Sequence, residues 1–146
     1  WNKAEQTVSV LRDGWYHTGD VGRVDDEGYL YLLDRSKDMI ISGGENVYCT
    51  EVEEAIYTHP AVLEAAVFGI PDEQWGEAVH AVVVTRAGVE VTPDDIVAHV
   101  RTSIAGYKVP RSVQLRSKEL PKSGPGKVLK RELRAPFWAG HDTAIN

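Results

Sequence analysis

A lysine at the end of a glycine-rich stretch is the residue whose type and position point most directly to chemistry. Lys127 follows two glycines and two prolines within residues 121–126. Glycine lets the backbone adopt positive φ angles and approach another molecule closely, so a cation here could contact a phosphate. The phosphate-loop motif is not met, because Pro121 stands where it needs glycine and Val128 where it needs serine or threonine. Taken alone, Lys127 fits either a phosphate contact or an ordinary surface lysine.

A second candidate site is the pair of adjacent glycines, Gly43 and Gly44. A charged tetrad at residues 34–37 ends one apolar run, and the short apolar run 39–41 separates the tetrad from the glycines. Charged residues between two strand-like runs predict a joint that can bend, and the glycines predict a loop with an accessible backbone. The same pattern is also compatible with a tight turn between two strands.

The composition is that of an ordinary globular domain. The chain has 146 residues, 42% of them hydrophobic and 26% charged, enough for about one domain with its own core. No apolar run approaches the ~20 residues that a membrane span needs, and the polar residues 1–7 give no sign of a secretory signal. The single cysteine, Cys49, suits a reducing compartment. We therefore expect a cytoplasmic protein, with peripheral binding to a membrane as an alternative, and the scattered histidines predict no metal site.

The charge is unevenly distributed along the chain. Residues 101–146 hold ten lysines and arginines against three acids, although the whole chain carries a net charge of −6. A basic third on an acidic protein indicates either an anionic ligand or a solvated basic face. Nucleic acid is a poor candidate, because the overall charge is negative and no aromatic residues interleave the basic run.

Alternating strand and helix signals must position these residues. Two β-prone runs, 21–24 and 29–33, predict a hairpin with Gly28 in its turn, and the second run is apolar enough to be buried on both faces or packed on another domain. Thr50 and Glu53 have the spacing of a capping box, which predicts a helix that ends at Pro60.

Further along, the pattern predicts two strands, a second helix and a third strand. The strands are expected at 62–70, before a turn at Pro71-Asp72, and at 77–86 in the centre of a sheet. The second helix is expected from Thr92 to Gly106, the third strand at 113–115 and a short helix around 129–133, with a loosely held tail from Pro136. The fold class is therefore α/β or α+β, a small mixed β-sheet flanked by helices plus an N-terminal β-hairpin.

Five short motifs occur in an order that resembles the C-terminal part of the adenylate-forming superfamily, specifically the fatty-acyl-CoA synthetases. They are His17–Asp20, Asp34–Lys37, Ile41–Asn46, Tyr107–Pro110 and Pro121–Lys127. The resemblance implies that residues 1–34 are the end of a large AMP-binding domain and that residues 35–146 form the C-terminal lid domain. It also implies that the rest of the large domain is missing, and that this chain is a fragment inactive on its own.

The resemblance also implies a reaction in two halves. A carboxylic acid attacks ATP to give an acyl-adenylate and pyrophosphate, and the thiol of CoA then displaces AMP. The ATP would carry Mg²⁺, whose ligands lie in the missing domain. By resemblance, the catalytic residue is Lys127, the ATP/AMP contacts are Asp20 and Arg35, the hinge is Lys37, and the CoA pantetheine side is formed by Gly43, Gly44 and Glu45.

Two departures and two alternatives qualify this interpretation. Ile41 stands where luciferase-like and plant-ligase-like members carry lysine, which favours the bacterial fatty-acyl branch, and Cys49 stands where many relatives have proline. One alternative is a stand-alone binding module with the lid fold and no catalysis. The other is an adenylation domain that delivers its acyl group to a carrier protein.

Overall fold

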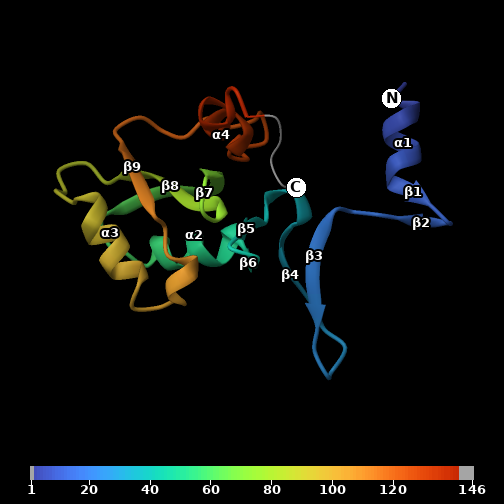
Figure 1. Ribbon diagram of the computed structural model, residues 1–146, viewed down its shortest axis with the longest axis horizontal. Helices are drawn as coiled ribbons and strands as arrows, with labels where there is room; N and C mark the ends of the chain where they lie inside the picture. The colour runs from blue at the N-terminus through green and yellow to red at the C-terminus, as the bar shows by residue number, and fades with distance from the viewer. Residues whose placement is uncertain (1, 142–146) are drawn as a thin grey trace.

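A computed structural model describes residues 2–141, and its N-terminal elements form no part of the core. These elements are α1 (Ala4–Val10), β1 (Leu11–Arg12), β2 (Trp15–Tyr16), β3 (Asp20–Val24) and β4 (Leu30–Arg35). Strands β1 and β2 pair antiparallel, as do β3 and β4. Figure 1 shows α1, β1 and β2 standing apart from the rest of the molecule. All buried residues of the described part lie between Ile40 and Leu133, so residues 2–34 contribute nothing to the hydrophobic core.

A five-stranded mixed sheet organises the remainder. Its strands are β5 (Ile40–Ser42), β6 (Glu45–Val47), β7 (Val62–Asp72), β8 (Gly76–Thr85) and β9 (Ser112–Arg116). The order along the sheet is β6-β5-β8-β7, and β9 also pairs with β8 as its parallel neighbour. Strand β8 is therefore central, as the sequence predicts, while β7 runs through Pro71 and Asp72, where we expected a turn.

Helices cover both faces of this sheet. The helices α2 (Cys49–Tyr57) and α3 (Pro93–Val100) pack on one face with Val67, and α4 (Lys130–Trp138) packs on the other with Ala66 and Phe68. Figure 1 shows α4 separated from α2 and α3 by the strands. Since both faces are covered, consecutive residues of β7 and β8 are buried, which explains why these runs are continuously apolar.

The helix boundaries correct two expectations and confirm the expected cap at Thr92. Thr50 and Glu53 do not form a capping box, because the Thr50 hydroxyl donates to the Leu33 carbonyl and Glu53 accepts from the backbone N–H of Val67. The capping box forms at α3 instead, between Thr92 and Asp95. That helix ends at Val100, and the short 3-10 helix η2 (Gly106–Lys108) follows where we expected the helix to end.

The end of the described chain is also better held than predicted. Helix α4 continues through Pro136 to Trp138, whose indole N–H donates to the Gly69 carbonyl at 3.0 Å. Phe137 packs against the core under α4. The expectation of a loose tail is therefore wrong for residues 136–138, and residues 142–146 lie outside the described part.

The predicted hairpin forms, but its apolar residues are not buried. Gly28 occupies the turn with φ 88°, while Leu30 and Leu32 are 65% and 68% exposed. Burial on both faces is therefore excluded in this chain, and packing on another domain stays a prediction. Within residues 2–141, no helix is both long and apolar enough to cross a membrane.

Candidate functional site

The hairpin brings Asp20 and Arg35 together. The two residues face each other across β3 and β4, and the Arg35 Nε lies 3.3 Å from a carboxylate oxygen of Asp20. Both side chains keep a solvent-exposed portion, 53% of the Arg35 side chain and 30% of the Asp20 side chain. A carboxylate beside a guanidinium offers an acceptor for hydroxyl groups and a donor for anions at one place.

Lys37 lies in a short turn between the hairpin and the sheet. The turn is the 3-10 helix η1 (Ser36–Asp38), closed by the Met39 N–H donating to the Arg35 carbonyl at 3.1 Å. Lys37 is exposed. A short exposed turn that connects two folded parts is a suitable position for a hinge.

Asp34 belongs to the charged tetrad 34–37, but no role of its own was predicted for it. Its carboxylate accepts hydrogen bonds from the backbone N–H groups of Cys49 at 2.5 Å and Thr50 at 3.3 Å, so it caps α2 from the hairpin. Together with the hydrogen bond from Thr50 to Leu33, this cap fastens the hairpin to the sheet domain. Any rotation about Lys37 would have to break these bonds.

The adjacent glycines form the turn between β5 and β6. Gly43 and Gly44 both have positive φ, 60° and 85°, as the two central residues of a type I′ hairpin turn require. The N–H of Gly43 donates to the Trp75 carbonyl at 2.9 Å, and a Cβ added at Gly43 would lie 2.6 Å from a ring carbon of Trp75. A Cβ at Gly44 would meet nothing within 4 Å, so this side of the turn faces open space. Glu45, directly after the glycines, is also exposed.

Lys127 projects from a small, well-anchored loop. Ser123 and Lys127 close the loop with a backbone hydrogen bond of 2.8 Å, and Gly126 adopts φ 84° just before the lysine. At the base of the loop, Lys122 forms an ion pair with Glu64. The Lys127 side chain is exposed and makes no ion pair within residues 2–141. The lysine is therefore held out toward solvent and is not packed in the core of this chain.

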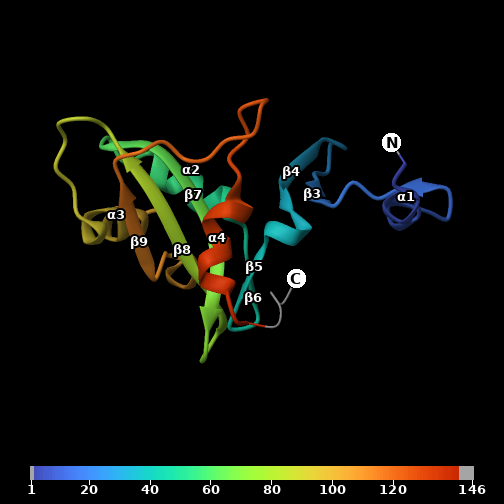
Figure 2. The same cartoon turned by 90° about the horizontal axis from the view of Figure 1, so that it is seen from above.

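The glycine turn and the Lys127 loop lie at opposite ends of the sheet domain. Figure 2 shows the turn between β5 and β6 at one edge and the loop that leads into α4 at the other. Within residues 2–141, no hydrogen bond or ion pair joins either of them to Asp20 or Arg35. Asp20 and Arg35 therefore lie together, while the glycine turn and Lys127 lie at separate ends of the sheet domain.

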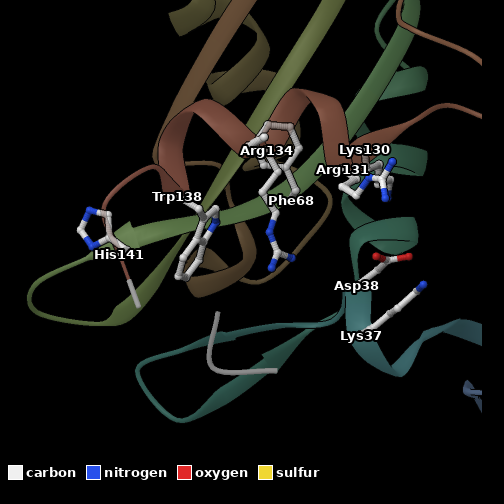
Figure 3. A pocket seen from close by; sticks show the side chains of 9 residues that line it. Lys37, Asp38, Phe68, Lys130, Arg131, Arg134, Trp138 and His141 are labelled. Atoms are coloured by element: carbon white, nitrogen blue, oxygen red, sulfur yellow. The ribbon is translucent and has the colours of Figure 1, made fainter. Parts of the chain in front are cut away.

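A cavity of about 380 Å³ lies between η1 and α4. Its lining residues are Lys37, Asp38, Phe68, Lys130, Arg131, Arg134, Ala135, Trp138 and His141. Figure 3 shows the side chains of α4 and η1 around it. Sequence reasoning found only Lys37 of this set. The spacing of Arg131 and Arg134 on one predicted helix was an available signal, but nothing in the sequence showed that this helix faces the hinge turn.

Glu77 is a buried acidic residue for which the sequence indicated no role. Its side chain is 2% exposed, and its carboxylate accepts from the backbone N–H of Ile41 at 2.9 Å. Burial raises the pKa of this carboxyl, against the opposing effects of the Ile41 hydrogen bond and of Arg134. Since β5 pairs with β8 only at Ser42 and Gly76, this side-chain bond supports the attachment of β5, which carries the glycine turn.

Residues 2–141 contain no group of three or more His, Cys, Asp or Glu side chains that could hold a metal ion. The expected Mg²⁺ ligands of the missing domain stay a prediction.

A comparison with protein families matches the sheet domain. The AMP-binding enzyme C-terminal domain family matches residues 51–127, just over half of the chain. The chain belongs to this family. The AMP-binding C-terminal domain is thus an α/β fold, and the match ends at Lys127, the residue on the exposed loop.

Curated relatives of this C-terminal domain are acid–thiol ligases. The chain is 52% identical over 137 residues to a feruloyl-CoA synthase of Amycolatopsis sp., covering 94% of the chain and 28% of the relative. It is 50% identical over 133 residues to a long-chain-fatty-acid–CoA ligase of Bacillus subtilis, covering 91% and 24%. It is 42% identical over its whole length to a fatty acid–[acyl-carrier-protein] ligase, ScoC, of Streptomyces coeruleorubidus, covering 28% of that protein. The chain spans about a quarter of the length of these relatives.

Solved structures place the fold among adenylate-forming enzymes. ATP-bound MatB from Rhodopseudomonas palustris matches with a TM-score of 0.85 at 38% identity, over 94% of this chain and 27% of MatB. Apo MatB matches over the same shares with a TM-score of 0.71. The chain as a whole is thus more similar to the ATP-bound MatB structure than to the apo structure.

Proposed function

We propose that this chain is the mobile C-terminal lid of an acyl-CoA synthetase, with residues 1–34 belonging to the large domain and residues 35–146 to the lid. The enzyme would activate a carboxylic acid with ATP and transfer the acyl group to CoA. The observation that carries the proposal is the exposed Lys127 on an anchored loop, in a chain of the AMP-binding C-terminal domain family. Such a lysine can complete a nucleotide pocket formed mainly by another domain.

In the first half-reaction, negative charge gathers on the carboxylate and on the α-phosphate oxygens. A positioned ammonium group stabilises that charge and holds the two reactants in line, which is the role we assign to Lys127. Asp20 would accept hydrogen bonds from the ribose hydroxyls, and Arg35 would hold the nucleotide beside them. The 3.3 Å contact between these two side chains supports their action at one place.

In the second half-reaction, the lid would rotate about Lys37 and bring the glycine turn beside the pantetheine arm of CoA. The open space around Gly44 and the exposure of Glu45 support this role, since a thiol-bearing arm needs a backbone without side-chain obstruction. The separation of this turn from Lys127 supports a rotation, because one fixed lid could not present both ends to a single active site (Figure 2).

The acyl group and its acceptor are less narrowly defined. We favour a fatty acid, although the relatives include a feruloyl-CoA synthase as well as a fatty-acid ligase. The second candidate function keeps the adenylation chemistry and changes the acceptor to a carrier protein, because ScoC is related over the whole chain. Assays of the intact protein with CoA and with a carrier protein as alternative acceptors would separate the two.

The test of the proposal uses Lys127→Ala in the intact enzyme. Loss of the ammonium group should slow ATP–pyrophosphate exchange by about 10²-fold or more, because a preorganised charge contributes about this much. Thioester formation from supplied acyl-adenylate should persist. The control is Lys118→Ala, which removes an exposed lysine nearby in the sequence and should change neither half-reaction. Equal loss of both half-reactions in Lys127→Ala would reject the role.

A further inference from the structure

The cavity between η1 and α4 carries more positive charge than its surroundings neutralise. Four of its lining residues are basic (Lys37, Lys130, Arg131 and Arg134), and only Asp38 is acidic. Lys130 is paired with Glu53 at 2.7 Å. The other three basic residues make no ion pair within residues 2–141. When the negative charge of Asp38 is subtracted from these three positive charges, a surplus of two positive charges remains.

Buried Glu77 does not remove this surplus. It attracts Arg134 from within the sheet, but it forms no ion pair with that residue. Its carboxylate accepts a hydrogen bond from the backbone N–H of Ile41. The two arginines of α4 are therefore available to an anion from outside the chain.

Fixed aromatic rings form the apolar part of the same cavity. Trp138 is held by its hydrogen bond to Gly69, and the Arg134 guanidinium lies 5.2 Å from the centre of its ring. Phe68 is held by contact with the Phe137 ring at 5.9 Å between centroids. In the view of Figure 3, the end of the Arg134 side chain extends between Trp138 and Asp38. A ligand here would meet cationic and aromatic groups side by side.

We propose that this cavity binds a phosphate monoester whose organic part is a planar ring, such as a nucleoside monophosphate. Guanidinium groups bind phosphate oxygens with paired, charge-assisted hydrogen bonds, and a phosphate dianion matches the surplus of two positive charges. A volume of about 380 Å³ is in the range of small-molecule sites and far exceeds the needs of phosphate alone. The ring of Trp138 supplies apolar surface for the organic part, while Phe68 is almost fully buried.

This site is separate from the residues to which the proposed reaction is assigned. The Lys127 loop, the glycine turn and the pair of Asp20 and Arg35 do not line the cavity, and only Lys37 is shared. The inference therefore goes beyond the proposed function, and it can be tested by direct binding whatever reaction the enzyme catalyses.

The experiment is calorimetric titration of the intact protein with adenosine monophosphate. Wild type should bind one equivalent more than the double variant Arg131→Gln/Arg134→Gln, or the double variant should bind that equivalent at least about tenfold more weakly, because two charge-assisted contacts are lost. The matched control is Arg101→Gln/Lys118→Gln, which removes the same charge from exposed positions outside the cavity. The control should bind as wild type does.

A second cavity variant tests the proposal independently in case the double variant misfolds. Ala135→Glu places a carboxylate at an exposed helix position that lines the cavity, and it should abolish the extra equivalent without removing any internal contact of Arg134. Identical stoichiometry and affinity in wild type and both cavity variants would overturn the proposal, including the case in which carboxylates of another domain fill the cavity. Inorganic phosphate is the second probe, and binding as tight as that of adenosine monophosphate would overturn the requirement for a ring.

Discussion

Gly43 and Gly44 adopt similar backbone conformations but have different surroundings, so they offer a matched pair of substitutions. Gly44→Ala should lower the free energy of unfolding by about 1–2 kcal/mol, the cost of placing a Cβ in the left-handed region. Gly43→Ala should cost more, because its Cβ would also lie 2.6 Å from the Trp75 ring. Denaturant unfolding of the two variants measures the difference.

The Arg111 guanidinium, at the residue before β9, lies 5.0 Å from the centroid of the Trp75 ring, so a shift of the ring would disturb this contact. Equal destabilisation by the two substitutions would show that the ring shifts without cost. That result would contradict the view that Trp75 fixes the position of the glycine turn.

Glu77 predicts a pH-dependent stability difference. Burial raises its pKa in the folded protein above the usual 4.5, so ionisation of this carboxyl opposes folding. Below the unfolded pKa, Glu77→Gln and wild type should have similar stability, because the carboxyl is protonated in both states. As the pH rises through the folded pKa, wild type should lose stability relative to Glu77→Gln, whose amide oxygen can still accept from Ile41.

The measurement is urea unfolding of both proteins at several values between pH 4 and pH 8, with the difference in free energy plotted against pH. Asp26→Asn, in the exposed hairpin turn, is the control for general charge effects. A constant difference for Glu77→Gln would contradict the raised pKa. A difference that shrinks with rising pH would contradict its sign.

At the scale of elements, the start of α2 is where sequence and structure differ most instructively. Asp34→Ala should lower the free energy of unfolding by about 1–2 kcal/mol, because this carboxylate caps the helix at Cys49 and Thr50. Asp34→Asn should cost less, since an amide oxygen can still accept these hydrogen bonds. Chemical denaturation measures both, and Asp26→Ala serves as the hairpin control.

If Asp34→Ala lowered the free energy of unfolding no more than Asp26→Ala does, the cap would contribute nothing to stability. Thr50 and Glu53 were the expected cap because a sequence pattern detects only residues that are close in sequence. Asp34 lies 15 residues before Cys49, and only the tertiary arrangement brings it to the helix. By contrast, the cap of α3 was predictable, because Thr92 and Asp95 are three residues apart and need no distant partner.

The same distinction explains which parts of the candidate site were predictable. Hydrophobic patterns predicted the hairpin, the central strand and the mixed sheet with helices, because each of these signals is local. The resemblance of the motifs implied Lys127, Asp20 and Arg35 as site residues, and only the structure shows the contact between Asp20 and Arg35. The cavity was not predictable, since η1, β7 and α4 contribute to it from residues 37 to 141. Its existence depends on how α4 packs on the sheet, which no local pattern specifies.

At the scale of the whole molecule, the hairpin lies outside the hydrophobic core of the sheet domain and is joined to that domain by a few hydrogen bonds. The core begins at Ile40, and Asp34 and Thr50 form hydrogen bonds across the joint. A boundary after residue 34 is consistent with this distribution of buried residues. The exposed apolar residues of β4 also suit packing on a large domain, which is where the proposed function puts them.

The joint itself yields the last prediction, Lys37→Pro in the intact enzyme. Proline fixes its own φ and disfavours the helical region for the preceding residue, yet Ser36 lies in the 3-10 turn η1. The substitution therefore opposes the present arrangement of the two parts and favours others. If the two half-reactions use different arrangements, the ratio of their rates should change by about tenfold or more, because a bias of 1.4 kcal/mol changes an equilibrium tenfold.

The rate of adenylation is measured by pyrophosphate exchange, and the rate of thioester formation is measured from supplied acyl-adenylate. Lys37→Ala removes the same ammonium group without restricting the backbone, so it should leave the ratio unchanged. An unchanged ratio in Lys37→Pro would mean that no rotation at this turn separates the half-reactions.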